Sequence, residues 1–363
     1  KGVVQTHGNL VANAWSMVKA MGIDAPTQLS VMPFYHAHAV GFGMVTCLLT
    51  DGHLLVAERM DPLSWAKLIR NLGVTLTSMV PNLLHLLERT GVRAADVPTL
   101  QFIFVSAAPL PSHLAKAFED RSGIHIAHAW GLSEFTNFAT CLPVTVKKDL
   151  RERLMYGETT PCVGSSLDGV EVEVRRTDGS VADDREGGEL WVRDPSLSLG
   201  YHNNPEATSD AVLDGWLRFG NEGYSISSDG RRYYFITDRI KNVIMRSGEK
   251  ISPIAVEATI VDKIPTLVNN LVALGFPHSV YGEEIGLVIE ESNSNEAILT
   301  LKSVIESMPA RQRPKVILVG KNVIPRTHTG KIQHRLLRPY FGKFSSTVEA
   351  YRVERVEQEA SHA

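Results

Sequence analysis

The sequence predicts an α/β protein with a large N-terminal domain, built on a mainly parallel α/β sheet plus a β-rich part, and a small α+β C-terminal domain. Short β-prone runs alternate with helical patterns up to about residue 130, which is typical of βαβ units and a parallel sheet. Period-two alternation around Asp-Gly turns follows after Gly164, which indicates antiparallel hairpins. At 363 residues and 44% hydrophobic content the chain is long enough for two domains, because single cores stop growing near ~250–300 residues.

The first part of the chain combines strands with helices that carry clear end signals. Asp61 followed by Pro62 predicts a helix start, because Asp accepts a hydrogen bond from the first turn and proline suits the first helical position. Gly73 predicts the end of that helix. Ser112 is expected to cap a helix that runs to Phe118. Strands are expected at residues 29–34, 53–58, 74–81, 100–108 and 124–130.

The second part predicts hairpins and then a separate small domain. The hairpins are expected at residues 169–194, around Thr-Asp-Gly-Ser, and at 224–239, around Ser-Asp-Gly. A helix, a pair of strands, a helix and a strand follow at residues 253–264, 268–290, 296–309 and 315–320. We therefore expect a large domain over 1–238, divided into an α/β part (1–163) and a β-rich part (164–238), and a C-terminal domain over 239–363.

Composition excludes several classes of protein. A net charge of -3 without blocks of like charge gives no reason to expect a nucleic acid or an anionic membrane as partner. Cys47, Cys141 and Cys162 lie far apart and in no CxxC spacing, which favours a reducing, cytoplasmic location without disulfides or zinc. The most apolar stretch, residues 39–57, is interrupted by polar residues and falls short of the ~20 apolar residues of a membrane span.

The peptide HAWGLSEFTN, residues 128–137, carries the first candidate site. It follows a predicted strand, and ligands in open α/β sheets bind outside the carboxyl ends of strands. There Trp130 can stack on a base, Ser133 can bond a phosphate oxygen and Glu134 can hold Mg²⁺. The alternative for this peptide alone is a buried Trp followed by a Ser-x-x-Asn cap.

Seven peptides together resemble one known family. In chain order they are KGVVQTHGNL, PFYHAHAVGFGM, HAWGLSEFTN, GELWV, WLRFGNEGY, TDRIKNVIMRSGEKISP and PRTHTGKIQHR. Their order and spacing resemble the adenylate-forming (AMP-binding) superfamily of acyl-CoA synthetases, aryl-acid ligases, luciferase and nonribosomal adenylation domains. The resemblance covers essentially the whole chain, and the family's N-terminal part up to the phosphate loop is not in it.

The resemblance implies a nucleotide site around the third of these peptides, HAWGLSEFTN. Trp130 and Gly131 stand where the family seats the nucleotide, with Trp130 in place of the usual tyrosine against adenine. Ser133 stands in place of the usual threonine on the phosphates, and Glu134 matches the glutamate associated with Mg²⁺. Arg239 matches the arginine that reaches ribose and phosphate.

The resemblance also implies a moving C-terminal domain. Lys331 matches the family's catalytic lysine, which contacts the carboxylate substrate and the α-phosphate; the alternative is a solvated lysine in a β-turn. A lysine is a mobile point charge suited to stabilising charge that develops during attack on phosphorus. Lys241 falls at the hinge about which the domain rotates between two catalytic poses, and Gly248 in the loop that shapes the thiol tunnel.

The acyl pocket is implied by two segments. His36 resembles the residue that gates this pocket, and Phe42 lies in the same segment; the alternative for His36 is a histidine satisfied by local backbone groups. Ser106 and Ala107 replace a glycine-rich turn and narrow the approach to the backbone, which implies either a smaller acyl pocket or an altered seat for the adenine. Members that activate α-amino acids place an aspartate near His36, and this segment has no acidic residue. We therefore expect a carboxylic acid without an α-ammonium group.

Two further departures from the family pattern bear on the nucleotide site. The family's phosphate loop would end at Lys1 and Gly2; since the chain opens without Met or a leader, we expect it to begin inside a longer polypeptide. Asn221 stands where the family has an aspartate that binds both ribose hydroxyls, and an amide lacks the charge-assisted component of those bonds.

The implied function is that of an acid-thiol ligase. It would use ATP and Mg²⁺ to convert a carboxylic acid to an acyl-adenylate with release of pyrophosphate, and would then pass the acyl group to coenzyme A or to the phosphopantetheine arm of a carrier protein. The alternative is a catalytically degenerate relative that binds nucleotide or acyl-adenylate without turnover, which Asn221 and the missing loop motivate.

Overall fold

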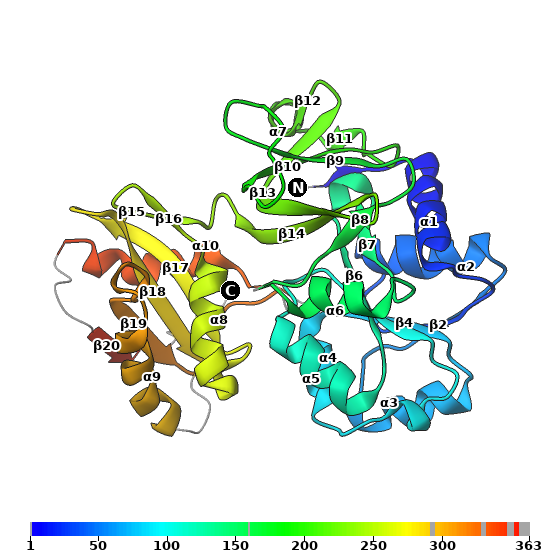
Figure 1. Cartoon of the computed structure of the whole chain (residues 1–363), viewed down its shortest axis with the longest axis horizontal. Helices are drawn as coiled ribbons and strands as arrows, with labels where there is room; N and C mark the ends of the chain where they lie inside the picture. The colour runs from blue at the N-terminus through cyan, green and yellow to red at the C-terminus, as the bar shows by residue number, and fades with distance from the viewer. Residues whose placement is uncertain (1, 159, 291–294, 328–331, 347–351, 356–363) are drawn as a thin grey trace. The chain divides into compact units, whose positions relative to one another are not determined.

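The computed structural model describes residues 2–158, 160–290, 295–327, 332–346 and 352–355 (Figure 1). The chain forms two compact units, residues 1–236 and 237–363, and each is described here by itself.

The first unit is built on a parallel sheet, as its sequence predicts. Neighbouring strands run in the order β3-β2-β4-β5-β6, and all of these pairs are parallel. The strands are β2 (Thr27–Ser30), β3 (His53–Val56), β4 (Leu76–Met79), β5 (Phe102–Val105) and β6 (Ile126–Trp130). Four of them, β3, β4, β5 and β6, lie within the segments expected to be strands and are shorter than those segments, whereas β2 begins two residues before the expected segment 29–34 and ends at Ser30.

The helices of this unit connect and cover the strands. They are α1 (His7–Met21), the π-helix η1 (Ala39–Val45), α2 (Thr46–Leu49), α3 (Pro62–Asn71), α4 (Pro81–Glu88), η2 (Ala94–Asp96), α5 (Ser112–Ser122), η3 (Ser133–Phe135), α6 (Lys148–Tyr156) and α7 (Pro205–Ala211).

Two of the predicted helix ends can be compared with the structure. Asp61 caps α3 as predicted, since its carboxylate accepts from Leu63 N at 3.2 Å, and Gly73 follows the helix with φ +62°. The prediction for Ser112 is wrong: Pro111 is the N-cap residue of α5, and Ser112 Oγ instead donates to the carbonyl of Glu158. The helix also continues one turn beyond Phe118, because the left-handed Gly123 ends it.

The β-rich part continues the same sheet instead of forming a layer of its own. After β6 the order runs β7-β8-β14-β13-β10-β9, with β12 beside β13, and the β6–β7 and β7–β8 pairs are antiparallel. The strands are β7 (Thr140–Leu142), β8 (Gly164–Ser166), β9 (Glu171–Arg175), β10 (Gly188–Arg193), β12 (Val212–Leu213), β13 (Trp216–Ser228) and β14 (Arg231–Arg239). Separately, β1 (Val3–Val4) pairs with β11 (Gly200–Tyr201).

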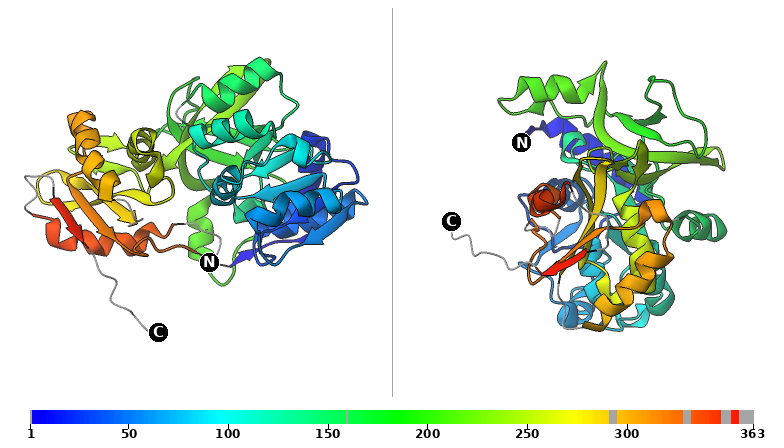
Figure 2. Two further views of the ribbon diagram at one scale, coloured as in Figure 1. Left: turned by 90° about the horizontal axis from the view of Figure 1, so that it is seen from below. Right: turned by 90° about the vertical axis from the view of Figure 1, so that its left-hand side faces the viewer.

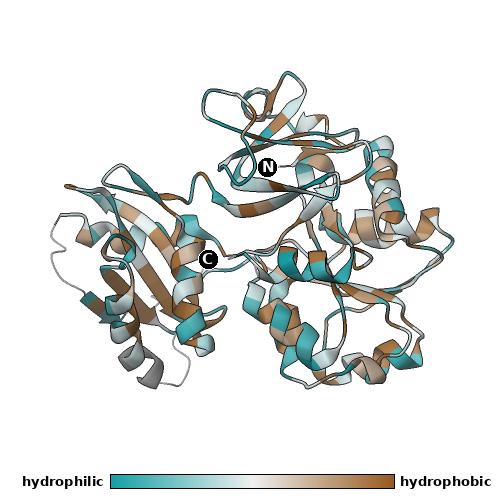
Figure 3. Cartoon of the chain, viewed as in Figure 1, coloured by the Kyte–Doolittle hydropathy of each residue, from teal (hydrophilic) through white to brown (hydrophobic). Residues whose placement is uncertain are grey.

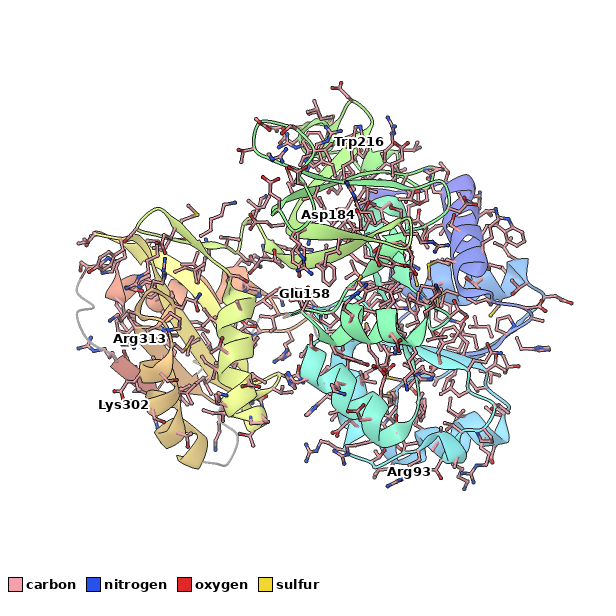
Figure 4. All side chains as sticks on the ribbon, in the orientation of Figure 1. Arg93, Glu158, Asp184, Trp216, Lys302 and Arg313 are labelled. Atoms are coloured by element: carbon pink, nitrogen blue, oxygen red, sulfur yellow. The ribbon has the colours of Figure 1, made fainter. Side chains whose placement is uncertain are left out.

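Both predicted hairpins are present, with different loops. Asp229 (φ 50°) and Gly230 (φ 73°) join β13 to β14, and two left-handed residues in succession match a type I′ turn. Between β9 and β10 the Thr-Asp-Gly-Ser turn closes only a short bridge from Arg175 to Val181. A longer loop follows this bridge and leads to β10. In this loop the carboxylate of Asp184 (labelled in Figure 4) accepts a hydrogen bond from Ser227 N at 2.7 Å.

The parallel sheet is buried on both faces. Along β5, Ile103 and Val105 face one hydrophobic cluster with Trp65 and Phe118, whereas Phe102 and Phe104 face another. Period-two alternation is therefore invisible in this strand, because both sets of side chains are apolar. Such burial fixes where each strand ends, and hence where the following segments lie.

The second unit is a smaller sheet covered on both faces. The sheet runs β16-β15-β18-β19-β20, with β17 beside β18. Helices α8 and α9 bury one face and η6 the other (Figure 2), and β17, β18 and β19 are largely apolar (Figure 3). The strands are β15 (Ile244–Arg246), β16 (Glu249–Ile251), β17 (Leu271–His278), β18 (Gly282–Glu290), β19 (Val316–Gly320) and β20 (Arg352–Arg355). The helices are α8 (Pro253–Lys263), η4 (Pro265–Leu267), α9 (Asn295–Ser307), η5 (Ala310–Gln312), α10 (His334–Leu337) and η6 (Arg338–Phe344).

A search of the helices in the described ranges finds none with the length and apolar content needed to cross a bilayer.

Candidate active site

The order of the parallel strands places the candidate segments at one edge of the sheet. The chain leaves β2 for β3 on one side and returns to β4 on the other, so β2 is a switch point of the sheet. Ligands of open α/β sheets bind at such points, outside the carboxyl ends of the strands. The segments that follow β2, β5 and β6 carry His36, Ser106 and Trp130 respectively. His36 and Trp130, which are 94 positions apart in the sequence, thus lie at the same edge.

Trp130 and Gly131 begin the loop after β6. The Trp130 ring is partly buried and meets the Phe135 ring edge to face, with the centroids 5.5 Å apart. A Cβ on Gly131 would lie 1.6 Å from the carbonyl oxygen of Asn137. Glycine is therefore required at this position by the return of the chain itself, whatever ligand the loop binds.

Ser133 and Glu134 form the short helix η3 that follows. Ser133 is exposed, and Glu134 is partly buried with its Oε1 accepting a hydrogen bond from the Tyr201 hydroxyl at 2.7 Å. The alternative that Ser133 is a helix cap is wrong, because Leu132 is the N-cap residue and makes no side-chain capping bond. The serine hydroxyl and the carboxylate both face away from the hydrophobic core.

Buried polar groups hold this loop in place. Thr136 has φ +69° and is fully buried, and its hydroxyl donates to the carbonyl of Ser196 at 3.0 Å. The Asn13 amide of α1 donates to the carbonyl of Phe138 at 2.7 Å and to Ser196 Oγ at 3.2 Å. A non-glycine residue at positive φ costs energy that the surrounding bonds must offset, and such positions cluster at functional sites.

In the segment after β2 that is predicted to shape the acyl pocket, the structure shows a buried histidine that the sequence analysis did not select. His38 is 2% exposed and shares a hydrogen bond of 3.2 Å between its Nδ1 and Ser106 Oγ. Burial, and to a lesser degree the nearby His36, lowers the pKa of His38 to about 3, so the ring is neutral at physiological pH. The sequence signal for this residue is the His-x-His spacing of His36 and His38.

The other predicted acyl-pocket residues differ in exposure. Phe42 is fully buried, with its ring stacked on Phe104 at 4.4 Å and the His38 ring 5.8 Å away. Ser106 is also fully buried, whereas His36 is partly buried and Ala107 is exposed. His38, Ser106 and Phe42 are thus buried together, whereas Ala107 and His36 are accessible at the surface.

Ala107 occupies a conformation that favours glycine. Its φ is +70°, in the left-handed region that costs an L-residue about 1–2 kcal/mol. The position follows β5 directly, at the carboxyl edge of the sheet. The sequence placed Ala107 in a turn that is usually glycine-rich, and the backbone shows why glycine suits it.

Asn221 lies in β13 within a β-bulge, between Arg218 and Glu222. The register between β10 and β13 shifts between Glu189 and Trp191, and Gly220 at φ 72° donates its N–H to Glu189 Oε1 at 3.1 Å. Bulges beside active sites re-aim a side chain. Asn221 is 6% exposed, and its Oδ1 has no hydrogen-bond partner among the described residues.

The candidates in the second unit lie at its start. Arg239 ends β14, and its backbone N–H donates to Asp238 Oδ1 at 2.7 Å. Lys241 is exposed in the following turn, and its carbonyl accepts from the Arg338 side chain at 3.2 Å. Gly248, with φ 81°, forms with Ser247 the turn between β15 and β16. Lys1 and Lys331 lie outside the described residues.

The chemistry of the donor set bears on metal binding. Across the described ranges, no group of three or more His, Cys, Asp or Glu side chains is placed to hold a metal ion. Mg²⁺ bound with nucleotides needs only one or two carboxylates, because phosphates and water supply the other ligands. Within the part of the chain that the structure describes, Glu134 Oε2 accepts no hydrogen bond, so this single carboxylate fits that kind of site.

Known proteins resemble the chain over most of its length. The oxalate–CoA ligase of Arabidopsis thaliana is 27% identical over 349 residues, which is 94% of this chain and 65% of that protein. The long-chain-fatty-acid–CoA ligase of Bacillus subtilis (strain 168) is 27% identical, over 93% of this chain and 59% of that protein. The chain thus spans about 60–65% of the length of these curated relatives.

The fold and a family model agree with these relatives. The crystal structure of ATP-bound MatB from Rhodopseudomonas palustris superposes with a TM-score of 0.81 at 22% identity, over 95% of this chain and 66% of that chain. At this identity the likeness shows the fold, including the mixed sheet and the small second unit. Residues 1–202, more than half of the 363-residue chain, match the model of the family described as "AMP-binding enzyme", so this chain belongs to the AMP-binding enzyme family.

Proposed function

We propose that this protein uses ATP to convert a carboxylic acid to its acyl-adenylate with release of pyrophosphate, and then transfers the acyl group to a thiol. The thiol is coenzyme A or the phosphopantetheine arm of a carrier protein. One observation carries the proposal: in a member of the AMP-binding family, an aromatic ring, a hydroxyl and a carboxylate from Trp130, Ser133 and Glu134 follow the carboxyl end of β6. The named CoA ligases among its relatives support the second half-reaction.

In this proposal the nucleotide binds along the loop after β6. The Trp130 face stacks on the adenine, Gly131 lets the chain turn there, and the exposed Ser133 hydroxyl bonds a phosphate oxygen. Asn221 meets the ribose, whose hydroxyl proton satisfies the buried Oδ1 that has no partner among the described residues. Arg239 and Lys1 add positive charge for the ribose and phosphate oxygens.

Glu134 is the residue that would hold magnesium. The ion, when bound, neutralises charge on the phosphates of ATP, which lowers the repulsion that an approaching carboxylate meets. For this the Glu134 side chain must keep one oxygen available, and Oε1 is already occupied by Tyr201.

The chemistry in this proposal is an attack on phosphorus followed by an attack on carbon. A carboxylate oxygen of the substrate bonds to the α-phosphorus, and the bond from that phosphorus to the pyrophosphate oxygen breaks. Lys331 stabilises the charge that develops on the α-phosphate. After rotation of the small domain about Lys241, the thiol enters past Gly248 and attacks the acyl carbon, and AMP leaves.

The acyl pocket is formed by the segments after β2 and β5. Phe42, Ser106 and the neutral His38 provide its base, and His36 and Ala107 shape its entrance. No acidic residue lies between residues 33 and 44, so the pocket has no partner there for an α-ammonium group. We place the substrate among carboxylic acids that lack this group, and the protein in the cytoplasm.

Asn221 favours a second candidate function, a catalytically degenerate protein that binds nucleotide or acyl-adenylate. The amide lacks the charge that the family's aspartate brings to the ribose, so affinity for ATP falls. A panel of aliphatic, aryl and amino acids, each incubated with ATP and the full-length protein, separates the two. Acyl-adenylate from one acid class, detected by mass spectrometry, supports the ligase; ATP binding in calorimetry without any adenylate or pyrophosphate supports the degenerate binder.

A further inference from the structure

Tyr201 stands beside Glu134 on a two-stranded ribbon. The ribbon is formed by β1 and β11, in which Val3 opposes Tyr201 and Val4 opposes Gly200. Two further backbone bonds extend it, from Leu199 N to the carbonyl of Val4 at 2.9 Å and from His202 N to the carbonyl of Gly2 at 2.8 Å. These backbone bonds hold the main chain of Tyr201 in place, and with it the point from which its side chain projects.

Both strands of this ribbon also bond to the loop that carries Glu134. Gln5, just after β1, donates from its amide to the carbonyl of Ser133 at 2.7 Å. Ser198, just before β11, donates its backbone N–H to the carbonyl of Glu134 at 2.7 Å. With the bond from the Tyr201 hydroxyl to Glu134 Oε1, also 2.7 Å, the ribbon holds the main chain and the carboxylate at once.

We propose that Tyr201 is a positioning residue for Glu134, which fixes the carboxylate through Oε1 so that Oε2 is directed to the magnesium ion of the bound nucleotide. This inference rests on the proposed function, because it concerns the same nucleotide site. A glutamate side chain has three rotatable bonds, and ordering them at the moment of metal binding weakens that binding. Tyr201 removes most of this freedom beforehand, as outer partners of metal ligands commonly do.

The chemistry of the pair supports a constant direction of the hydrogen bond. A phenol hydroxyl carries a proton to donate, whereas an ionised carboxylate can only accept, so the Tyr201 hydroxyl is the donor to Glu134 Oε1. A carboxylate that accepts one such bond keeps its charge for a cation on the second oxygen.

The test replaces Tyr201 by phenylalanine in the full-length protein and measures ATP binding by calorimetry at a series of free Mg²⁺ concentrations. The free Mg²⁺ that half-maximally tightens ATP binding is expected to rise about 10-fold in Tyr201→Phe, while ATP binding in excess chelator stays the same. The matched control is Tyr224→Phe, since Tyr224 makes a similar bond of 3.1 Å to a different carboxylate, Glu158 (labelled in Figure 4). This control is expected to keep the wild-type Mg²⁺ dependence.

The outcomes separate this inference from the function on which it rests. If the wild type shows no Mg²⁺ dependence of ATP binding, the proposed metal role of Glu134 fails, and the inference with it. If the wild type is Mg²⁺-dependent and Tyr201→Phe has the same dependence, the inference alone is overturned. A lower thermal midpoint of Tyr201→Phe with unchanged Mg²⁺ dependence also overturns it, because the hydroxyl is then only structural.

Discussion

Asn221→Asp introduces the aspartate that the resemblance to adenylate-forming enzymes implies at this position, and we predict opposite effects on stability and on ATP binding. Asn221 is 6% exposed and its Oδ1 has no partner in the described part of the chain. A carboxylate in the same place is buried without a donor among the described residues. An unpaired buried acceptor costs about 1–3 kcal/mol, and more when charged, so we expect unfolding free energy to fall by about 2–3 kcal/mol.

ATP reverses this penalty in the same variant. The ribose hydroxyls give the carboxylate the donors that it lacks, and bonds to a charged acceptor are roughly twice as strong as neutral ones. We expect ATP to bind Asn221→Asp about 1–2 kcal/mol more tightly than the wild type, which is a factor of about 5–30 in Kd. ATP must therefore stabilise the variant against urea more than it stabilises the wild type.

Calorimetric titration with ATP and urea unfolding with and without ATP measure both effects. Asn322→Asp is the control, because it makes the same chemical change in an exposed turn and is expected to change neither quantity. Equal or weaker ATP binding by Asn221→Asp, together with lost stability, would refute the assignment of Asn221 to the ribose.

Three further predictions concern the loops at the carboxyl edge of the sheet. Gly131→Ala should lower the free energy of unfolding by about 3 kcal/mol or more, since its Cβ would lie 1.6 Å from the Asn137 oxygen; a change below 1 kcal/mol in urea unfolding would contradict this. Ala107→Gly should raise the free energy of unfolding by up to about 1 kcal/mol, because relief of the strain at φ +70° exceeds the added unfolded-state entropy of glycine; a loss of stability would count against it. His38 has a folded pKa of about 3, below its ordinary value near 6.5, so the unfolded chain binds the proton more strongly and stability falls as pH drops from 6.5 towards 3. At pH 5 the protonation of His38 in the unfolded chain lowers the free energy of unfolding by about 2 kcal/mol. His38→Asn, which still offers Ser106 a partner, should therefore lose less stability between pH 7 and pH 5 than the wild type does. Equal losses would show that His38 is not responsible.

The sequence predicted the parallel sheet because strand and helix signals there are local. A capping Asp61 before Pro62, and β-prone runs of apolar residues, act within a few residues and need no tertiary partner. Ser112 failed as a cap because Pro111 already has the extended backbone of an N-cap, so the helix starts one residue earlier than predicted, at Ser112 itself. That choice is made by backbone dihedrals and is not visible in residue types alone.

The missed parts of the candidate site depend on distant partners. The His-x-His spacing points to a second histidine, but it does not predict that His38 is buried against Phe42, Phe104 and Phe138. Nor does it predict the bond of His38 to Ser106, which lies 68 positions away. Tyr201 likewise meets Glu134 only because β11 pairs with β1. Contacts of this kind arise from the folded topology, so motif reading finds the carboxylate and not the phenol that orients it.

The central claim, that a carboxylate oxygen attacks the α-phosphorus of ATP, has a direct isotopic test. The acid found active in the substrate panel is labelled with ¹⁸O in both carboxylate oxygens and incubated with ATP, Mg²⁺, the thiol acceptor and the full-length protein. The products are analysed by mass spectrometry, with Lys331→Ala as the control, which is expected to produce no labelled AMP. The account predicts one ¹⁸O atom in AMP and none in pyrophosphate, since the oxygen that bonded to phosphorus stays there when the thiol displaces AMP. Label in inorganic phosphate with ADP as the other product, or unlabelled AMP alongside the acyl thioester, would contradict an acyl-adenylate and with it the proposed function.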